Sequence, residues 1–192
     1  MAIDWILFKA CNGLAGRSPV LDAVIRMLMN DYALTTMLVL FLFALWFSGQ
    51  SPAARAHNQR ALLSAIASMF LGNLLIKAMN LVLYRPRPFA YHTVTLLFYR
   101  PSDSSFPSNA AAVGFSIATS VWLFNRRVGL VLYVVASLLG LARICGGVHY
   151  PSDIAGGALI GMISAYLVAR RIRYFDRLSA IIIQQLRRFL LA

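Results

Sequence analysis

Charged side chains are scarce in this sequence. They make up only 12% of the 192 residues, whereas 60% are hydrophobic, and a soluble domain carries about 25% charged residues. A composition with so few charged and so many hydrophobic residues excludes a disordered chain. A helix satisfies its own backbone hydrogen bonds in lipid, so the sequence predicts one all-α domain over residues 1–192, a polytopic membrane helical bundle.

Carboxylates and cysteines are also few. The chain has six Asp and Glu residues and two cysteines. Cys11 and Cys145 lack metal-site spacing, and the loops described below hold no carboxylate cluster that suits Mg²⁺ or Zn²⁺. We therefore expect no metal and no other cofactor. We expect no cleavable signal peptide either, because no basic start precedes an apolar run.

Lysine and arginine outnumber the acids, which gives a net charge of +12. Such a charge can indicate nucleic-acid binding. Here the cations lie between apolar runs and at the C-terminus, as in a membrane protein with basic cytoplasmic loops. We therefore predict membrane lipids as partners and no nucleic acid.

Five apolar runs are candidate membrane spans, which need about 20 residues each. They cover Tyr32 to Ser48, Ala61 to Tyr84, Ala110 to Phe124, Val128 to Leu141 and Ile154 to Ala169. The third and fourth are short, so we expect their ends to extend into the neighbouring loops. The mixed composition of residues 4–29 indicates an amphipathic or re-entrant pair of helices that is interrupted at "GLAGRSP". The alternative is that this stretch forms a partial sixth span.

The basic residues assign the loops to two sides of the membrane. The first connection, the connection between the third and fourth spans, and the tail together hold more than half of the 18 lysines and arginines. That side should be cytoplasmic, with residues 171–192 as a basic amphipathic tail on anionic lipid. The loops 85–109 and 143–153 then lie together on the outer face.

The loop 85–109 contains two groups suited to phosphate. In "RPRPF" the prolines favour an extended chain. The guanidinium groups of Arg85 and Arg87 can each donate two hydrogen bonds to phosphate oxygens. The alternative is that both side chains only extend to the lipid headgroups. In "SSFPSNAAA" Ser108 or Asn109 is a good helix N-cap. A helix N-terminus can bind an anion, although an ordinary cap is commoner.

The loop 143–153, "RICGGVHYPSD", adds a third cation, Arg143, and a histidine. Asp153 follows His149 by four residues. A carboxylate bonded to an imidazole fixes its tautomer and raises its basicity, so His149 is a candidate nucleophile or base. Together the two loops predict metal-free phosphoryl transfer through a phosphohistidine.

These residues resemble the type 2 phosphatidic acid phosphatase superfamily, which shares its fold with vanadium haloperoxidases. The family's third motif, Ser-Arg, five residues, His, three residues, Asp, is matched except that Ala142 replaces the serine. Its Pro-Ser-Gly-His motif is matched at Pro107 and Ser108, with Asn109 for glycine. Its Lys, six residues, Arg-Pro motif is matched at Arg87 and Pro88. Asn80 occupies the lysine position. Lys77 lies one helical turn earlier on nearly the same face, so either residue is a candidate for the role of that lysine.

The resemblance covers about residues 60–170 and implies five to six membrane helices with a site at the outer surface. "RPRPF" and "FPSN" look closest to bacterial undecaprenyl-diphosphate phosphatases. By resemblance, His149 attacks phosphorus, Asp153 orients His149, and Arg87, Arg143 and Ser108 hold phosphate oxygens, without a metal.

One family residue is missing. The histidine of the second motif, the general acid, would lie at position 110, where this sequence has Ala110. Because the rest of the site is intact, we interpret the alanine as an engineered substitution that impairs activity. A naturally inactive relative is the alternative.

The predicted function is hydrolysis of undecaprenyl diphosphate, a polyprenyl diphosphate lipid, in the bacterial cytoplasmic membrane. This reaction would recycle the cell-wall lipid carrier and reduce bacitracin sensitivity. One alternative keeps the mechanism but acts on phosphatidylglycerol phosphate or phosphatidic acid. The other is a lipid-phosphate binder or flippase without catalysis.

Overall fold

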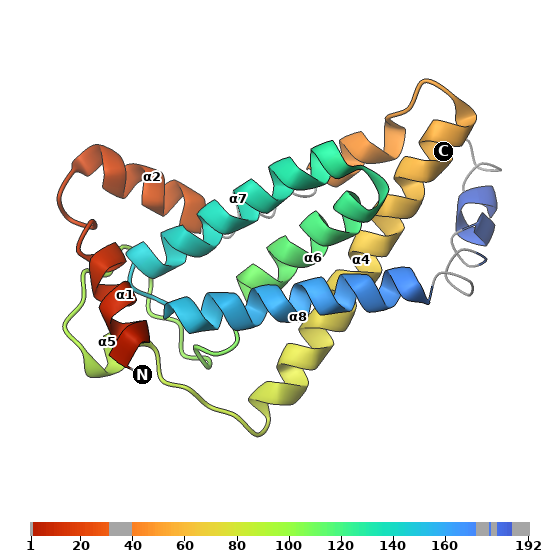
Figure 1. Cartoon of the computed structure of the whole chain (residues 1–192). Helices are drawn as coiled ribbons and strands as arrows, with labels where there is room; N and C mark the ends of the chain where they lie inside the picture. The colour runs from red at the N-terminus through yellow and green to blue at the C-terminus, as the bar shows by residue number, and fades with distance from the viewer. Residues whose placement is uncertain (1, 31–39, 172–176, 178–179, 186–192) are drawn as a thin grey trace.

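The computed structural model describes residues 2–30, 40–171, 177 and 180–185 (Figure 1). Every regular element in these ranges is a helix, and these ranges contain no strand. The all-α prediction is confirmed.

Four long helices form the bundle. They are α4 (Pro52–Asn80), α6 (Asn109–Phe124), α7 (Arg126–Cys145) and α8 (Pro151–Arg170). The α6 helix contacts the other three and lies between them (Figure 1). Helices α4, α7 and α8 are long and apolar enough to cross a membrane, so the chain is an integral membrane protein. The shorter α6 is enclosed by them.

Small residues let α8 approach α6 closely. A Cβ added at Gly157 would lie 2.2 Å from the carbonyl oxygen of Ser108, and one added at Gly161 would lie 2.3 Å from that of Ala112. Membrane helices commonly use small residues spaced four apart for such contacts. The second and third turns of α8 thereby lie against the start of α6.

We expect Gly161→Ala to destabilise the bundle. The added Cβ would overlap the backbone of α6, and overpacking of this kind costs about 1–3 kcal/mol. At about 2–4 °C per kcal/mol for a chain of this size, the thermal midpoint followed by circular dichroism in detergent should fall by several degrees. Gly72→Ala is the matched control, because its nearest neighbour, Ser164 Oγ, would be 3.5 Å away. Equal midpoints for the two variants would refute the close α6–α8 contact.

Capping residues explain where the helices end. Ser51 accepts a hydrogen bond from the backbone nitrogen of Ala54 (3.2 Å), so α4 begins at Pro52 instead of Ala61. Ser108 caps the start of α6, and Asn125 both ends α6 and caps α7. The third predicted span therefore does not extend into its loops, whereas the fourth does, as predicted.

The N-terminal stretch is a helix pair, as predicted. It consists of α1 (Ala2–Asn12) and α2 (Pro19–Met29). Each has 11 residues, too few to cross a bilayer, which takes about 20. The side chain of Asn12 anchors α1 by donating to the carbonyl oxygens of Cys145 (2.8 Å) and Thr95 (2.7 Å). The pair therefore lies at the end of the bundle where α7 ends and α8 begins (Figure 1).

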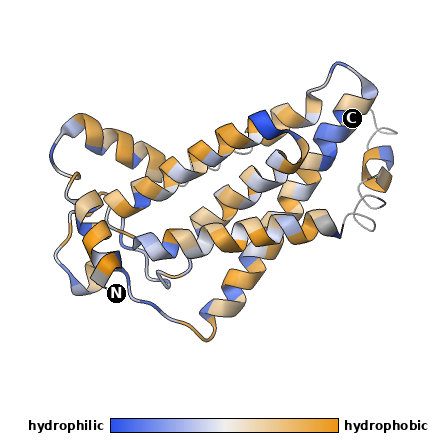
Figure 2. Cartoon of the chain, viewed as in Figure 1, coloured by the Kyte–Doolittle hydropathy of each residue, from blue (hydrophilic) through white to orange (hydrophobic). Residues whose placement is uncertain are grey.

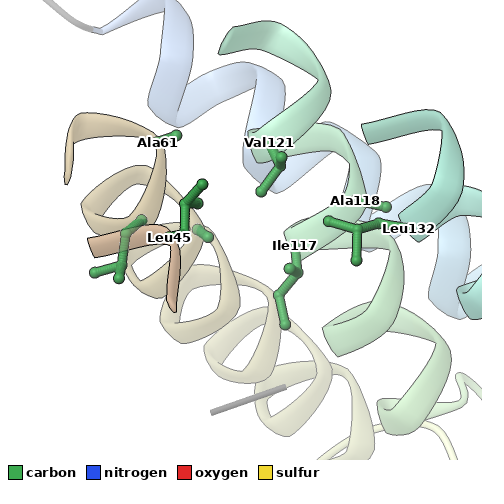
Figure 3. Close-up of a cluster of buried hydrophobic side chains, with 8 residues drawn as sticks. Leu45, Ala61, Ile117, Ala118, Val121 and Leu132 are labelled. Carbon is green, nitrogen blue, oxygen red and sulfur yellow. The ribbon is translucent and has the colours of Figure 1, made fainter. Parts of the chain in front are cut away.

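The opposite end of the bundle has an apolar core. Buried side chains from α4, α6, α7 and the helical residues 40–47 meet there (Figure 3). Hydrophilic residues mark the start of α7 next to this core (Figure 2). The first predicted span, 32–48, lies partly outside the described residues, and the predicted tail, 171–192, lies mostly outside them.

Candidate active site

The two polar loops meet at one end of the bundle, as predicted. The backbone nitrogen of Ser108 donates to the carbonyl oxygen of Asp153 (3.0 Å), and that of Ser105 donates to the carbonyl oxygen of Arg85 (2.8 Å). The first bond joins the start of α6 to the start of α8, and the second brings the two ends of the 85–105 segment together.

His149 is buried between the loops with a defined tautomer. Its Nδ1 lies 2.9 Å from the carbonyl oxygen of Ser105. A carbonyl only accepts hydrogen bonds, so Nδ1 carries the proton. Nε2 lies 3.2 Å from Nη1 of Arg87 and 3.5 Å from Oγ of Ser108. In the neutral ring the lone pair of Nε2 therefore points toward these two phosphate-binding candidates.

The surroundings keep this ring neutral. Burial lowers the pKa of His149 below its ordinary value; Arg87 and Arg143 lower it further, while Asp153 opposes them. An imidazole that stays unprotonated at neutral pH can act as a nucleophile.

Asp153 lies beside His149 but does not bond it directly. Its Oδ2 is 3.6 Å from Nδ1 of His149, beyond hydrogen-bonding distance. The same oxygen accepts from Oγ of Ser105 (2.5 Å) and from the backbone nitrogen of Tyr150 (2.8 Å). Ser105 therefore bridges the pair, because its carbonyl receives the ring proton and its hydroxyl donates to the carboxylate. The direct bond between Asp153 and His149 that the sequence predicted is replaced by this bridge.

Two buried arginines provide positive charge near His149. Arg87 donates from Nη2 to Asp103 (2.8 Å) and from Nη1 to the carbonyl oxygen of Val148 (3.0 Å). Arg143, in the last turn of α7, has its Cζ 5.6 Å from the ring centroid of Phe98. These contacts hold both guanidiniums beside the imidazole.

A pocket of about 340 Å³ opens in front of these groups. The predicted site residues that line it are Asn80, Arg87, Asn109, Ala110, Arg143 and His149. Ser108 reaches it through its contact with Nε2. Lys77 is exposed on α4 and is not part of the lining, so of the two alternatives the structure brings Asn80 to the pocket.

Arg85 faces away from this pocket. Its Nη1 donates to Oδ1 of Asp153 (2.6 Å), and its Nη2 donates to Oδ2 of Asp4 (2.7 Å). The structure thus does not bring Arg85 together with the other predicted phosphate ligands. It places Arg85 behind the carboxylate, between two acids.

The sequence pattern indicates no role for Ser105, Phe98 or Asp4. Ser105 lies in a quoted segment, but no spacing rule marks a backbone carbonyl as an imidazole partner. Asp4 lies 148 residues from Ser152, to which it bonds, so it leaves no local signal. Among the described residues, no group of three or more His, Cys, Asp or Glu side chains is arranged to hold a metal ion.

Comparison with known proteins gives consistent matches. The family model described as the PAP2 superfamily matches residues 61–177. The undecaprenyl-diphosphatase BcrC of Bacillus subtilis is 32% identical over 168 residues, which cover 88% of this chain and 83% of that protein. The crystal structure of Aquifex aeolicus LpxE is similar with a TM-score of 0.70 and 29% identity, covering 88% of this chain and 96% of that one. The crystal structure of a transmembrane PAP2-type phosphatidylglycerolphosphate phosphatase from Bacillus subtilis is also similar, with a TM-score of 0.61 and 25% identity. The match covers 92% of this chain and 85% of that one.

Proposed function

Because the chain belongs to the PAP2 superfamily, as its motifs predicted, we propose that this membrane lipid phosphatase hydrolyses undecaprenyl diphosphate to undecaprenyl phosphate and inorganic phosphate. The observation that carries the proposal is the unprotonated Nε2 of His149, which lies between Arg87 and Ser108 at a pocket that Arg143 also lines. The identity with the undecaprenyl-diphosphatase of Bacillus subtilis supports this substrate.

The reaction proceeds in two displacements. Nε2 of His149 attacks the terminal phosphorus, and the bond from this phosphorus to the bridging oxygen breaks, releasing lipid phosphate and leaving a phosphohistidine. A water molecule then attacks the same phosphorus, which releases inorganic phosphate and restores the ring. The guanidiniums of Arg87 and Arg143 and the hydroxyl of Ser108 stabilise charge on the phosphoryl oxygens.

The partners of Nδ1 support the first displacement. When Nε2 bonds to phosphorus, the ring becomes positively charged. The carbonyl oxygen of Ser105 holds the Nδ1 proton, and the carboxylate of Asp153, 3.6 Å away, stabilises the charge. No metal is required in this scheme.

Ala110 favours a diphosphate substrate. It lines the pocket and offers no proton to a leaving oxygen. A lipid phosphate leaves readily as an anion, whereas a lipid alkoxide needs protonation. A site with alanine here therefore retains more activity on a diphosphate than on a monophosphate.

We place the enzyme in the bacterial cytoplasmic membrane with its site facing outward. The α4 start and the α6–α7 turn lie at the opposite end of the bundle from the α7–α8 connection (Figure 1), which contains His149. They carry Arg55, Arg60, Arg126 and Arg127. Basic loops stay on the cytoplasmic side. The outward site would meet the lipid carrier after cell-wall precursors are transferred from it.

A second candidate substrate is phosphatidylglycerol phosphate. The structural similarity to the phosphatidylglycerolphosphate phosphatase of Bacillus subtilis favours it. It differs chemically in that its leaving group is an alkoxide.

Phosphate release from a panel of lipids tests this assignment. We expect undecaprenyl diphosphate to be hydrolysed at least about tenfold faster, in kcat/KM, than phosphatidylglycerol phosphate or phosphatidic acid, because their leaving groups need an acid that Ala110 cannot supply. Undecaprenyl monophosphate, with the same chain and one phosphate fewer, is the matched control. Faster hydrolysis of phosphatidylglycerol phosphate would replace the proposed substrate with the alternative.

A further inference from the structure

We propose that Asp4 and Arg85 are positioning residues that hold Asp153 beside His149, so that the N-terminal helix α1 completes the catalytic site. This inference rests on the proposed phosphatase function. The family match begins at residue 61, so Asp4 lies outside the matched region.

Arg85 holds the oxygen of Asp153 that faces away from the histidine. Asp153 has no exposed surface, and its Oδ2 already accepts from Ser105 and Tyr150. Arg85 supplies a charge-assisted bond to Oδ1 at 2.6 Å. Without it, a buried anionic oxygen would lose this donor, which is costly. Rotation of the carboxylate to regain a partner would move Oδ2 away from Ser105 and the Nδ1 side of His149.

The orientation of Arg85 is itself fixed from two sides. Its Cζ lies 4.3 Å from the ring centroid of Tyr150, a cation–π contact that sets the plane of the guanidinium. Its Nη2 donates to Oδ2 of Asp4 at 2.7 Å. The guanidinium therefore bridges two carboxylates, one from α1 and one from α8, and is not available to a phosphate.

Asp4 fixes both Arg85 and the backbone next to Asp153. Its Oδ1 accepts from the backbone nitrogen of Ser152 (2.9 Å), and its Oδ2 accepts from Oγ of Ser152 (2.6 Å). Burial would raise the pKa of Asp4, but the bonds from Ser152 and Arg85 lower it below the ordinary value. The carboxylate is therefore ionised at neutral pH, and it places a negative charge at the N-terminus of α8, which is favourable.

Helix α1 is docked firmly enough to serve this purpose. Phe8 is fully buried beside Ile144 and Tyr150, and Asn12 bonds the last residue of α7. Asp4 thus reaches the site from a helix anchored at two further points. The chain of contacts runs from α1 through Asp4, Arg85, Asp153 and Ser105 to the Nδ1 proton of His149.

The variants Asp4→Asn and Arg85→Met test the proposal in the otherwise unchanged chain and in an Ala110→His background. We expect kcat for undecaprenyl diphosphate to fall about 10- to 100-fold, because misplacement of a reacting group by about 1 Å can cost 10²-fold. KM should change by less than about twofold, since neither residue contacts the substrate. Arg85→Lys, which keeps the charge but loses the two-pronged geometry, should recover part of kcat.

Coupling between the two residues separates positioning from general destabilisation. If Asp4 acts through Arg85, Asp4→Asn should lower kcat by less than about twofold in an Arg85→Met background, because residues in one network are not additive. Asp22→Asn and Arg100→Met are matched controls. Asp22, on α2, accepts a hydrogen bond from the backbone nitrogen of Gly16 in the preceding turn. The Cζ atom of Arg100 lies 5.8 Å from the ring centroid of Phe89. Both should keep the unsubstituted rate.

A spectroscopic readout decides the proposal independently of turnover. In protein labelled with nitrogen-15 histidine, the Nδ1 resonance of His149, assigned by its loss in His149→Gln, should shift in Asp4→Asn and Arg85→Met and stay in place in both controls. An unmoved resonance, or an unchanged kcat in both variants, would overturn the positioning role. If no lipid is hydrolysed even with Ala110→His, the proposed function fails, and the resonance still tests the contact chain.

Discussion

Replacing His149 by glutamine is expected to abolish phosphate release and the covalent intermediate together. Glutamine keeps a polar side chain of similar size but has no ring nitrogen whose lone pair can attack phosphorus. Loss of a nucleophile typically costs at least about 10⁴-fold in kcat. The measurement is a rapid quench with undecaprenyl diphosphate labelled with phosphorus-32 at the terminal phosphate. The unsubstituted enzyme should yield acid-labile, protein-bound label, and His149→Gln should yield none.

A second histidine provides the control for this experiment. His57 lies on α4 at the opposite end of the bundle, with Nε2 3.0 Å from the carbonyl oxygen of Phe124. His57→Gln should retain both label and turnover. A protein that only carried the lipid across the membrane would show no labelled intermediate and would keep its transport in His149→Gln, which would refute the phosphohistidine mechanism.

The site could be predicted wherever its residues are close in sequence. Arg143 lies in the last turn of α7, His149 in the connection that follows, and Asp153 in the first turn of α8, so their spacing alone placed them together. Ser108 could be recognised because an N-cap has a local signature. The helices followed from apolar runs, but the start of α4 did not, because the polar residues 52–60 continue the helix without an apolar pattern.

The different roles of Arg85 and Arg87 could not be predicted from composition. Arg87 has φ −75° and ψ 158°, which are polyproline II values. With three residues per turn, side chains two positions apart in such a segment point in different directions. The prolines therefore direct the side chains of Arg85 and Arg87 to different sites, although the sequence suggested that both bind phosphate. Arg87 faces the pocket, and Arg85 faces Asp153 and Asp4.

Helix geometry likewise distinguishes Asn80 from Lys77. Ile76 and Asn80, four residues apart on one face of α4, both line the pocket. Lys77 is turned about 100° around the helix from Ile76 and is not part of the lining. Asp4 is beyond any local pattern, because only the docking of α1 against α7 and α8 brings it to the site.

Restoring a general acid by Ala110→His is expected to increase hydrolysis. Position 110 lies in the first turn of α6 and lines the pocket that contains His149. A positioned acid is worth about 10²–10⁴-fold. The gain should be largest for monophosphate lipids such as phosphatidic acid, because an alkoxide leaving group needs the proton most. For undecaprenyl diphosphate, whose leaving group is a phosphate, the gain in kcat should be smaller.

The position of the acid, and not merely its presence, should decide the result. Asn109→His introduces the same ring at an adjacent residue of the pocket lining, but about 100° around the helix, and should give no gain in kcat. Free imidazole added to the unsubstituted enzyme can enter the space beside Ala110 and should restore part of the rate on phosphatidic acid. Equal rates with alanine and histidine at position 110, on both classes of lipid, would show that protonation of the leaving oxygen does not limit this reaction. The preference for diphosphates would then require a cause other than the missing acid.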